Sequence, residues 1–351
     1  MGTVRIGVVG IGAWACDVHI PTFRRLPGAQ ITALCSRSPE NIERGREALG
    51  GEAEPAVFAS YDALLASDAV DAVVLCTTNV THGSMTLQAL QSGKHVLVEK
   101  PMATDPAECP PIVEEAERRG LVVQVGLELR YSDVVRTMRR LIEDGAIGEP
   151  AILRTAVWRE WGLLTGWRAD ADRSGGLHHE LAVHYIDVFN VLVGRPPEWA
   201  SAAGGSKLGI RGVDYAFTTI GYEGGAVASF EMCLFAAGGG SDITVEVVGI
   251  EGRLVGEIVG GKVELWPRGG EAQDHSPRRD DAEDSGFPGS LESARAFVEC
   301  VQTGARPSAD AVEGARLCRV CEAARLSARQ GGERIDVASL HPPGGWEPPG
   351  G

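Results

Sequence analysis

The N-terminal stretch from Val4 to Ala15 constrains the fold most, because it joins an apolar strand to a glycine-rich turn. Apolar residues on both sides of Gly7 are typical of the first strand of a parallel sheet that is covered on both faces. The turn that follows has the spacing Gly10-x-Gly12-x-x-Ala15, the Gly/Ala form of the dinucleotide fingerprint. Gly10 permits a tight turn, Gly12 permits close approach of a pyrophosphate, and Ala15 permits close packing of helix on strand. Glycines also occur in ordinary strand-to-helix turns, so this motif needs support from the rest of the chain.

The spacing of apolar segments divides the chain into two parts. Up to residue 125, apolar strands alternate with helical segments, which predicts a doubly wound parallel sheet of the Rossmann type. From residue 126 the strands alternate polar and apolar residues and are separated by glycine pairs, which predicts a large, mostly antiparallel open sheet. We therefore expect an α/β protein with a Rossmann domain over 1–125, an α+β domain over 126–340 and a disordered Pro/Gly-rich tail over 341–351.

Charge and composition bear on partners and location. The 351 residues carry a formal net charge of −15, which disfavours nucleic acid and anionic membrane surfaces. No apolar run approaches the roughly 18 residues that span a bilayer, and no charged leader precedes the first strand, so we expect a cytoplasmic protein. The eight cysteines are scattered, as suits a reducing compartment. The close pair Cys318-x-x-Cys321 has no second pair or His cluster beside it, which favours helix packing over a zinc or redox site.

The end of the second strand bears on the choice of cofactor. The Rossmann pattern expects an acidic residue there for the adenosine ribose, but this chain has Cys35-Ser36-Arg37-Ser38. Without the carboxylate, a 2′-phosphate is not repelled. Ser36 can donate a hydrogen bond to it, and Arg37 can form a forked, charge-assisted pair with it. We therefore expect NADP (NADPH) to be preferred over NAD, the alternative being that Arg37 is a solvated loop residue.

Lys100 follows a buried parallel strand, at the edge where open α/β sheets bind ligands. The chain has four lysines against 29 arginines, so a lysine at this place is informative. Its ammonium can stabilise negative charge that develops on a substrate oxygen. Pro101 can fix the backbone there, a cis peptide being one way to do so, and a surface turn is the alternative for Glu99-Lys100-Pro101. Residues 77–82 end the neighbouring strand and are expected at the same edge.

One helix of the second part carries a polar stripe. Glu180, His184 and Asp187 are spaced four and three apart, so a regular helix over residues 177–193 presents them on one face. His184 with a carboxylate one turn to either side can act as an acid or base near neutral pH, although such a stripe is more often solvated. His179, Glu180 and His184 also resemble metal ligands, but the chain has no His-Glu-x-x-His spacing, and we expect no metal.

Three of the seven tryptophans fall within eleven residues of one another, interleaved with charged residues. Flat aromatic faces beside hydrogen-bonding groups suit a polyhydroxylated ring, and ordinary core packing is the alternative. The residues concerned are Trp158, Arg159, Glu160, Trp161, Trp167 and Arg168.

Taken together, these motifs closely resemble the Gfo/Idh/MocA oxidoreductases, the family of glucose-fructose oxidoreductase and inositol dehydrogenase. The resemblance covers nearly the whole chain apart from the tail. The motifs that carry it, in the family's order and spacing, are Gly10-x-Gly12-x-x-Ala15, Thr77-x-Asn79-x-x-His82, Glu99-Lys100-Pro101, Gly126-x-x-x-Arg130, Trp167-Arg168, and Gly175-Gly176 before Glu180-x-x-x-His184-x-x-Asp187.

The resemblance implies NAD(P)-dependent hydride transfer between nicotinamide C4 and a carbinol or keto carbon of a sugar, polyol or sugar derivative. It implies that Lys100 polarises the reacting oxygen, that His184 is the acid/base, and that Glu180 stands for the family's catalytic carboxylate. It also implies that the second domain binds substrate and forms subunit contacts through its open sheet, so we expect a homodimer or homotetramer. The expected cofactor contacts are Gly10, Ile11, Gly12, Ala13, Trp14, Ser36, Arg37, Thr77, Thr78, Asn79, His82, Glu99, Lys100, Arg130, Trp167 and Arg168.

Three positions depart from the family's pattern: Glu180 replaces an Asp, Thr78 replaces a Pro, and Leu127 replaces an aromatic residue. Two other functions stay open, namely a glycoside-cleaving enzyme that retains NAD(P) and a non-catalytic protein that senses a sugar or cofactor. The presence of both Lys100 and His184 disfavours the sensor. A preference for NADP(H) favours reduction of a keto-sugar over oxidation of a free sugar or polyol.

Overall fold

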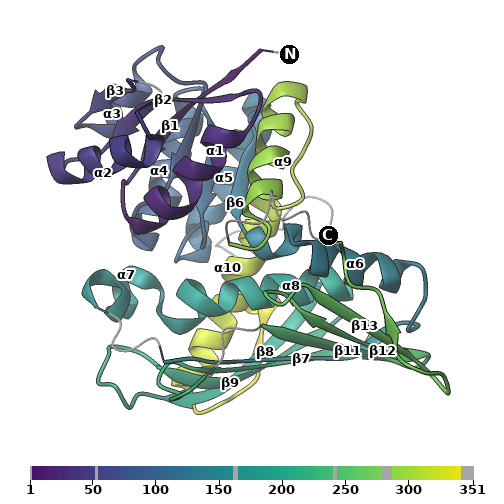
Figure 1. Cartoon of the computed structure of the whole chain (residues 1–351). Helices are drawn as coiled ribbons and strands as arrows, with labels where there is room; N and C mark the ends of the chain where they lie inside the picture. The colour runs from purple at the N-terminus through teal and green to yellow at the C-terminus, as the bar shows by residue number, and fades with distance from the viewer. Residues whose placement is uncertain (1, 52–53, 161–164, 240–242, 279–286, 341–351) are drawn as a thin grey trace. The chain divides into compact units, whose positions relative to one another are not determined.

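The computed structural model describes residues 2–51, 54–160, 165–239, 243–278 and 287–340. They form two compact units (Figure 1). Unit 1 comprises Met1–Leu127 and Ser290–Arg316, and unit 2 comprises Glu128–Gly289 and Leu317–Gly351. The expectations for Trp161 and for the tail over 341–351 concern residues outside this description. Among the described residues, no helix has the length and apolar character needed to cross a bilayer.

Unit 1 is built on a six-stranded sheet in the order β3-β2-β1-β4-β5-β6. Every neighbouring pair in it is parallel, so the carboxyl ends of the strands meet at one edge. This is the doubly wound Rossmann order, and it confirms the fold class expected for the first part of the chain. The strands are β1 (Val4–Val9), β2 (Ala29–Cys35), β3 (Ala56–Phe58), β4 (Ala72–Leu75), β5 (His95–Glu99) and β6 (Val123–Gly126).

Helices cover the sheet of unit 1, and their ends follow local sequence signals. Ser38 caps α2 (Pro39–Leu49) by accepting a hydrogen bond from the backbone N–H of Asn41, and Gly120 in the left-handed conformation ends α5 (Cys109–Arg119). The helical segment after the glycine turn contains a π-helical turn over Ala15–His19, which continues into α1. The others are α1 (Ile20–Arg25), α2 (Pro39–Leu49), α3 (Tyr61–Leu65), α4 (His82–Gln91), α5 (Cys109–Arg119) and α9 (Ser290–Thr303), with α10 (Ala311–Arg329) beginning in this unit.

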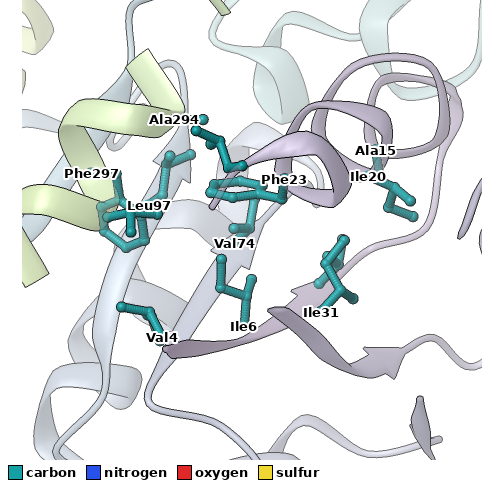
Figure 2. Packing of buried hydrophobic residues seen from close by; sticks show 14 of the residues in the cluster. Val4, Ile6, Ala15, Ile20, Phe23, Ile31, Val74, Leu97, Ala294 and Phe297 are labelled. Atoms are coloured by element: carbon teal, nitrogen blue, oxygen red, sulfur yellow. The ribbon is translucent and has the colours of Figure 1, made fainter. Parts of the chain in front are cut away.

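The core on one face of this sheet joins segments that are far apart in sequence (Figure 2). Ile6 of β1 and Leu97 of β5 pack there with Phe23 of α1 and Phe297 of α9. The two phenylalanine rings meet edge to face, with centroids 6.5 Å apart. Residues 290–316 therefore belong to the structure of unit 1, although a division of the sequence at residue 125 assigns them to the second part.

Unit 2 contains a nine-stranded sheet in the order β14-β13-β12-β11-β7-β10-β9-β8-β15. Only the β7/β10 pair is parallel among the pairings of the described strands, which confirms the mostly antiparallel open sheet. The strands are β7 (Pro150–Trp158), β8 (Pro197–Gly205), β9 (Tyr215–Tyr222), β10 (Val227–Cys233), β11 (Thr244–Gly249), β12 (Gly252–Glu257), β13 (Lys262–Pro267), β14 (Gln273–Asp274) and β15 (Ile335–Asp336).

The two faces of this sheet differ. The inner face is covered by α6 (Asp133–Glu143) and α8 (Val183–Val193), and the ring of Tyr185 on α8 stacks on Phe230 of β10 at 5.2 Å (Figure 1). On β7 the residues at alternate positions are buried or exposed, because successive side chains point to opposite faces. The outer face exposes large apolar side chains, each at least 37% accessible: Ile152, Trp158, Phe217, Val248 and Trp266.

The turn after β1 requires a glycine at position 10 but not at position 12. Gly10 has φ +84°, and a Cβ at this position would lie 2.6 Å from the carbonyl oxygen of Cys76, just beyond β4. Gly12 has no such conformation, and a Cβ there would meet no atom within 4 Å. The first glycine is therefore required by the fold, whereas the second leaves open space above the turn.

Replacing each glycine by alanine separates these roles. Gly10→Ala is expected to lower the free energy of unfolding by about 1–3 kcal/mol, because it adds backbone strain and a clash with Cys76. Gly12→Ala, the matched control, is expected to change it by less than about 0.5 kcal/mol. Urea unfolding of both variants measures the difference, and equal stability of the two would contradict this account of the turn.

Candidate nucleotide and catalytic site

The glycine turn presents backbone at the carboxyl edge of the sheet in unit 1. The N–H of Gly10 donates to the carbonyl of Cys35 at 3.1 Å, and that of Gly12 donates to the carbonyl of Gly10 at 3.0 Å. Helical structure starts directly after Gly12, at Ala13, so the N–H groups of the turn lie at the start of a helix, where anions are favoured. The side chain of Ile11 is buried in the core at 1% exposure, so this residue offers a ligand only its backbone. At Gly12 the backbone is open to approach, because a Cβ there would meet no atom within 4 Å.

The end of β2 carries the residues expected to choose between NADP and NAD. The Ser36 hydroxyl accepts from the N–H of Ser38 at 3.2 Å, and the Ser38 hydroxyl accepts from the N–H of Asn41 at 3.3 Å. These bonds shape the loop while leaving the Ser36 hydroxyl proton able to donate. Arg37 between the two serines is exposed, and no acidic residue stands in this loop.

The end of β4 holds a histidine in the interior. His82 is 1% exposed, with Nδ1 2.8 Å from the carbonyl oxygen of Pro101 and Nε2 3.2 Å from that of Thr77. Burial lowers the pKa of His82, while its contacts with backbone carbonyls from two loops act in the opposite direction. His82, expected among the cofactor contacts, thus has its ring nitrogens against the protein's own carbonyls. Asn79 is also buried, while Thr77 and Thr78 remain partly exposed at the edge.

The end of β5 brings Lys100 to the same edge. Its ammonium-bearing side chain is partly exposed, and the peptide that joins it to Pro101 is cis. Glu99, one residue earlier, is buried and accepts a hydrogen bond from Trp14 Nε1 at 2.8 Å. The same oxygen lies 2.6 Å from His19 Nε2. Sequence reasoning missed His19, because its partner lies 80 residues away and no local pattern links the two.

In unit 2, a carboxylate from outside the helix lies near His184. His184 on α8 has Nδ1 3.9 Å from Glu128 Oε2, with side chains 12% and 2% exposed. Glu180 precedes His184 in a π-helical turn over His178–Ala182, and Asp187 follows it by three residues on α8.

Asp187 and Arg130 form a buried ion pair within unit 2. Arg130 Nε donates to Asp187 Oδ2 at 2.9 Å, and a second guanidinium nitrogen contacts the other carboxylate oxygen. The two side chains are 5% and 1% exposed. Arg130, expected to contact the cofactor, is thus engaged by Asp187 and joins the turn Glu128–Tyr131 to α8. Removing one partner of such a pair typically costs about 3–5 kcal/mol, because a charge is left buried.

Glu180 is held by a second arginine. Arg168 Nε donates to Glu180 Oε1 at 2.9 Å, and the guanidinium lies over the ring of Trp167, 4.6 Å from its centroid. Glu180 is 4% exposed at its side chain and Arg168 is 50% exposed, so the pair lies partly open to solvent. The motif Trp167-Arg168 therefore comes together with Glu180, which the sequence did not indicate.

The neighbouring histidines belong to the interior of unit 2. His178 Nε2 lies 3.1 Å from the Thr218 hydroxyl, and His179 Nδ1 lies 3.1 Å from the carbonyl oxygen of Gly175. Burial lowers the pKa of His178 to about 3 and that of His179 to about 4, so both rings are neutral. In the described part of unit 2, the set His179, Glu180 and His184 does not gather closely enough to share an ion.

Trp158 does not join Trp167 in an aromatic surface for a sugar. Its neighbour Val157 is buried on the inner face of the sheet, and Trp158 is 52% exposed on the outer face, away from α8. Successive side chains of a strand point to opposite faces of the sheet, which explains this placement. The closeness of the tryptophans in the sequence could not indicate it.

Comparison with known proteins agrees with this architecture. Residues 4–127 match the Gfo/Idh/MocA model described as "Oxidoreductase family, NAD-binding Rossmann fold", and residues 139–337 match "Oxidoreductase family, C-terminal alpha/beta domain". D-apiose dehydrogenase of Paraburkholderia graminis is 26% identical over 344 residues, 95% of this chain and 89% of that protein. Inositol 2-dehydrogenase 2 of Saccharopolyspora erythraea is 32% identical over 272 residues, 76% of this chain and 74% of that protein.

A solved structure shows the same fold. Levoglucosan dehydrogenase in complex with NADH superposes with a TM-score of 0.85 at 20% identity, covering 95% of this chain and 99% of that one. With both family models matched in order along the sequence, the chain belongs to the Gfo/Idh/MocA oxidoreductase family.

Proposed function

We propose that this protein transfers a hydride between a nicotinamide dinucleotide and a carbinol or keto carbon of a sugar, polyol or sugar derivative. The observation that carries the proposal is the hydrogen bond from Trp14 to Glu99, which sets the dinucleotide turn beside the residue that precedes Lys100. A nucleotide-binding turn and a cation thus share one edge of one sheet. The relatives named as apiose and inositol dehydrogenases support a polyhydroxylated substrate.

The residues of unit 1 fit a dinucleotide. The backbone from Gly10 to Trp14 would hold the pyrophosphate over the open space at Gly12. Ser36 and Arg37 would hold the adenosine ribose and, in NADP, its 2′-phosphate. A bound nicotinamide would supply or take up the hydride.

Lys100 and His184 take the polar roles in this proposal. The Lys100 ammonium donates to the substrate oxygen and stabilises the negative charge that develops on it. His184 accepts the hydroxyl proton during oxidation and returns it during reduction, and the carboxylate of Glu128 lies 3.9 Å from its ring. Glu180, oriented by Arg168, accepts a hydrogen bond from another hydroxyl of the substrate and so fixes the sugar.

Lys100→Met and His184→Asn are each expected to lower kcat by about a hundredfold or more, because each removes a charge-stabilising or proton-transferring group. Nucleotide affinity is expected to stay within about threefold of the unaltered protein. Nicotinamide absorbance with a panel of aldoses, inositols and keto-sugars measures turnover, and calorimetry measures nucleotide binding.

Lys94→Met is the matched control. Lys94 precedes the same strand at its opposite end, where its ammonium donates to the carbonyls of Ser67 and Val70. The kcat of Lys94→Met is expected to stay within about twofold of that of the unaltered protein. Near-normal turnover in Lys100→Met would overturn the proposed role of this lysine, and product formation without net change in absorbance would point to the glycoside-cleaving alternative.

We propose further that NADPH is preferred over NADH, because Arg37 is exposed beside Ser36 in a loop without a carboxylate. Arg37→Ala is expected to weaken NADPH binding about 10- to 100-fold, as loss of a charge-assisted hydrogen bond does, and to leave NADH binding within about threefold. Arg46→Ala, which alters a solvated arginine on α2 paired with Glu43, should change neither affinity. Equal or tighter binding of NADH by the unaltered protein would refute the preference.

We also propose that the outer face of the unit 2 sheet joins subunits into a homodimer or homotetramer, since it exposes five large apolar side chains on a single surface. Ile152→Lys is expected to shift sedimentation toward a smaller species by placing a charge in that surface. Val57→Lys, at an exposed apolar residue of unit 1, is expected to leave sedimentation unchanged. A monomer in the unaltered protein at micromolar concentration would rule out this interface.

A further inference from the structure

Glu99 connects the glycine turn to the end of β5 through both of its carboxylate oxygens. Oε1 accepts the hydrogen bond from Trp14 Nε1 at 2.8 Å and lies 2.6 Å from His19 Nε2. Oε2 accepts from the backbone N–H of Lys100 at 3.3 Å. Trp14 and His19 belong to the turn and the first helical turn after β1, so a single side chain ties that segment to the backbone of Lys100.

The chemistry of the donors fixes this arrangement. An indole nitrogen can only donate and an ionised carboxylate can only accept, so the contact with Trp14 has one possible direction. The side chains of Glu99 and His19 are 8% and 7% exposed, and their short contact is typical of a charge-assisted hydrogen bond. Because both side chains are buried, water competes weakly for these hydrogen bonds, and the bonds hold the carboxylate in place.

The neighbouring strand leaves room for this carboxylate. A Cβ at Gly126, the last residue of β6, would lie 2.8 Å from Glu99 Oε1. The glycine thus allows the carboxylate to lie against β6 while it bonds to Trp14 and His19. Three separate segments of unit 1 are arranged around one acidic side chain.

We propose that Glu99 is a positioning residue, which holds Lys100 in register with the dinucleotide turn through its bonds to Trp14, His19 and the Lys100 backbone. This inference rests on the proposed role of Lys100 as the cation at the substrate oxygen. Glu99 does not itself touch substrate in this scheme. It acts by limiting the positions that the backbone of Lys100 can take relative to a nucleotide bound on the turn.

Glu99→Gln tests the proposal, because it keeps the size of the side chain and removes its charge. It is expected to lower kcat about tenfold or more, with KM and nucleotide affinity within about threefold. Trp14→Phe should lower kcat in the same direction, and the two changes together should cost less than the product of the single effects, because Trp14→Phe removes and Glu99→Gln weakens the same hydrogen bond. Glu115→Gln on α5, whose carboxylate pairs with Arg118 and Arg119, is the matched control and should leave kcat within about twofold.

A second measurement needs neither nucleotide nor turnover. The indole N–H of Trp14 gives a resonance in a proton–nitrogen spectrum, assigned by its loss in Trp14→Phe, and Glu99→Gln is expected to move it upfield. An unmoved resonance, or multiplicative effects of the two variants on kcat, would overturn the positioning role. A fall in thermal stability and nucleotide affinity in parallel with kcat would show packing alone and also overturn it.

The two proposals can fail separately. If Lys100→Met abolishes turnover while Glu99→Gln leaves kcat unchanged, the positioning role is wrong and the proposed function stands. If Lys100→Met keeps near-normal turnover, the proposed role of the lysine fails, and the positioning role fails with it.

Discussion

The close approach of the end of β1 to the end of β4 is the constraint on which unit 1 depends. No side chain fits at position 10, because a Cβ would press on the carbonyl of Cys76. With the two strand ends this close, the turn after β1 lies among the loops that follow β4 and β5. That proximity allows Trp14 to reach Glu99 and sets backbone N–H groups beside a lysine at one edge of the sheet.

In unit 2, a buried ion pair fixes the position of a turn. Arg130 and Asp187 are almost fully removed from solvent, and their two-point contact fixes the turn Glu128–Tyr131 against α8. Glu128, which lies in that turn, is the carboxylate beside His184. The ion pair thus acts on the candidate acid/base indirectly, by setting where its neighbour stands. Asp187 of the ion pair and the candidate acid/base His184 lie on the same helix, three residues apart.

The sequence was sufficient wherever a short-range rule decides the structure. Strand alternation, glycine turns and helix caps predicted both sheets, and the position of Lys100 after β5 followed from parallel strand ends meeting at one edge. Local periodicity did not indicate the partner of Glu180, because Arg168 lies in a separate segment of the chain. Local periodicity also could not predict the contact between His19 and Glu99, because the two residues are 80 positions apart in the sequence. Likewise, the apolar stripe of α9 indicates that the helix is buried, but it does not indicate which sheet the helix covers.

The place of α9 has a consequence for synthesis on the ribosome. Phe297 and its neighbours complete the core beneath Phe23, yet they are made after the whole of Glu128–Gly289. A nascent chain that has emerged only as far as β6 therefore leaves exposed the part of the apolar core that α9 covers, and its Rossmann unit reaches the native core only after residues 290–316 have been made. The nucleotide-binding half consequently cannot be excised as one continuous fragment of the gene product.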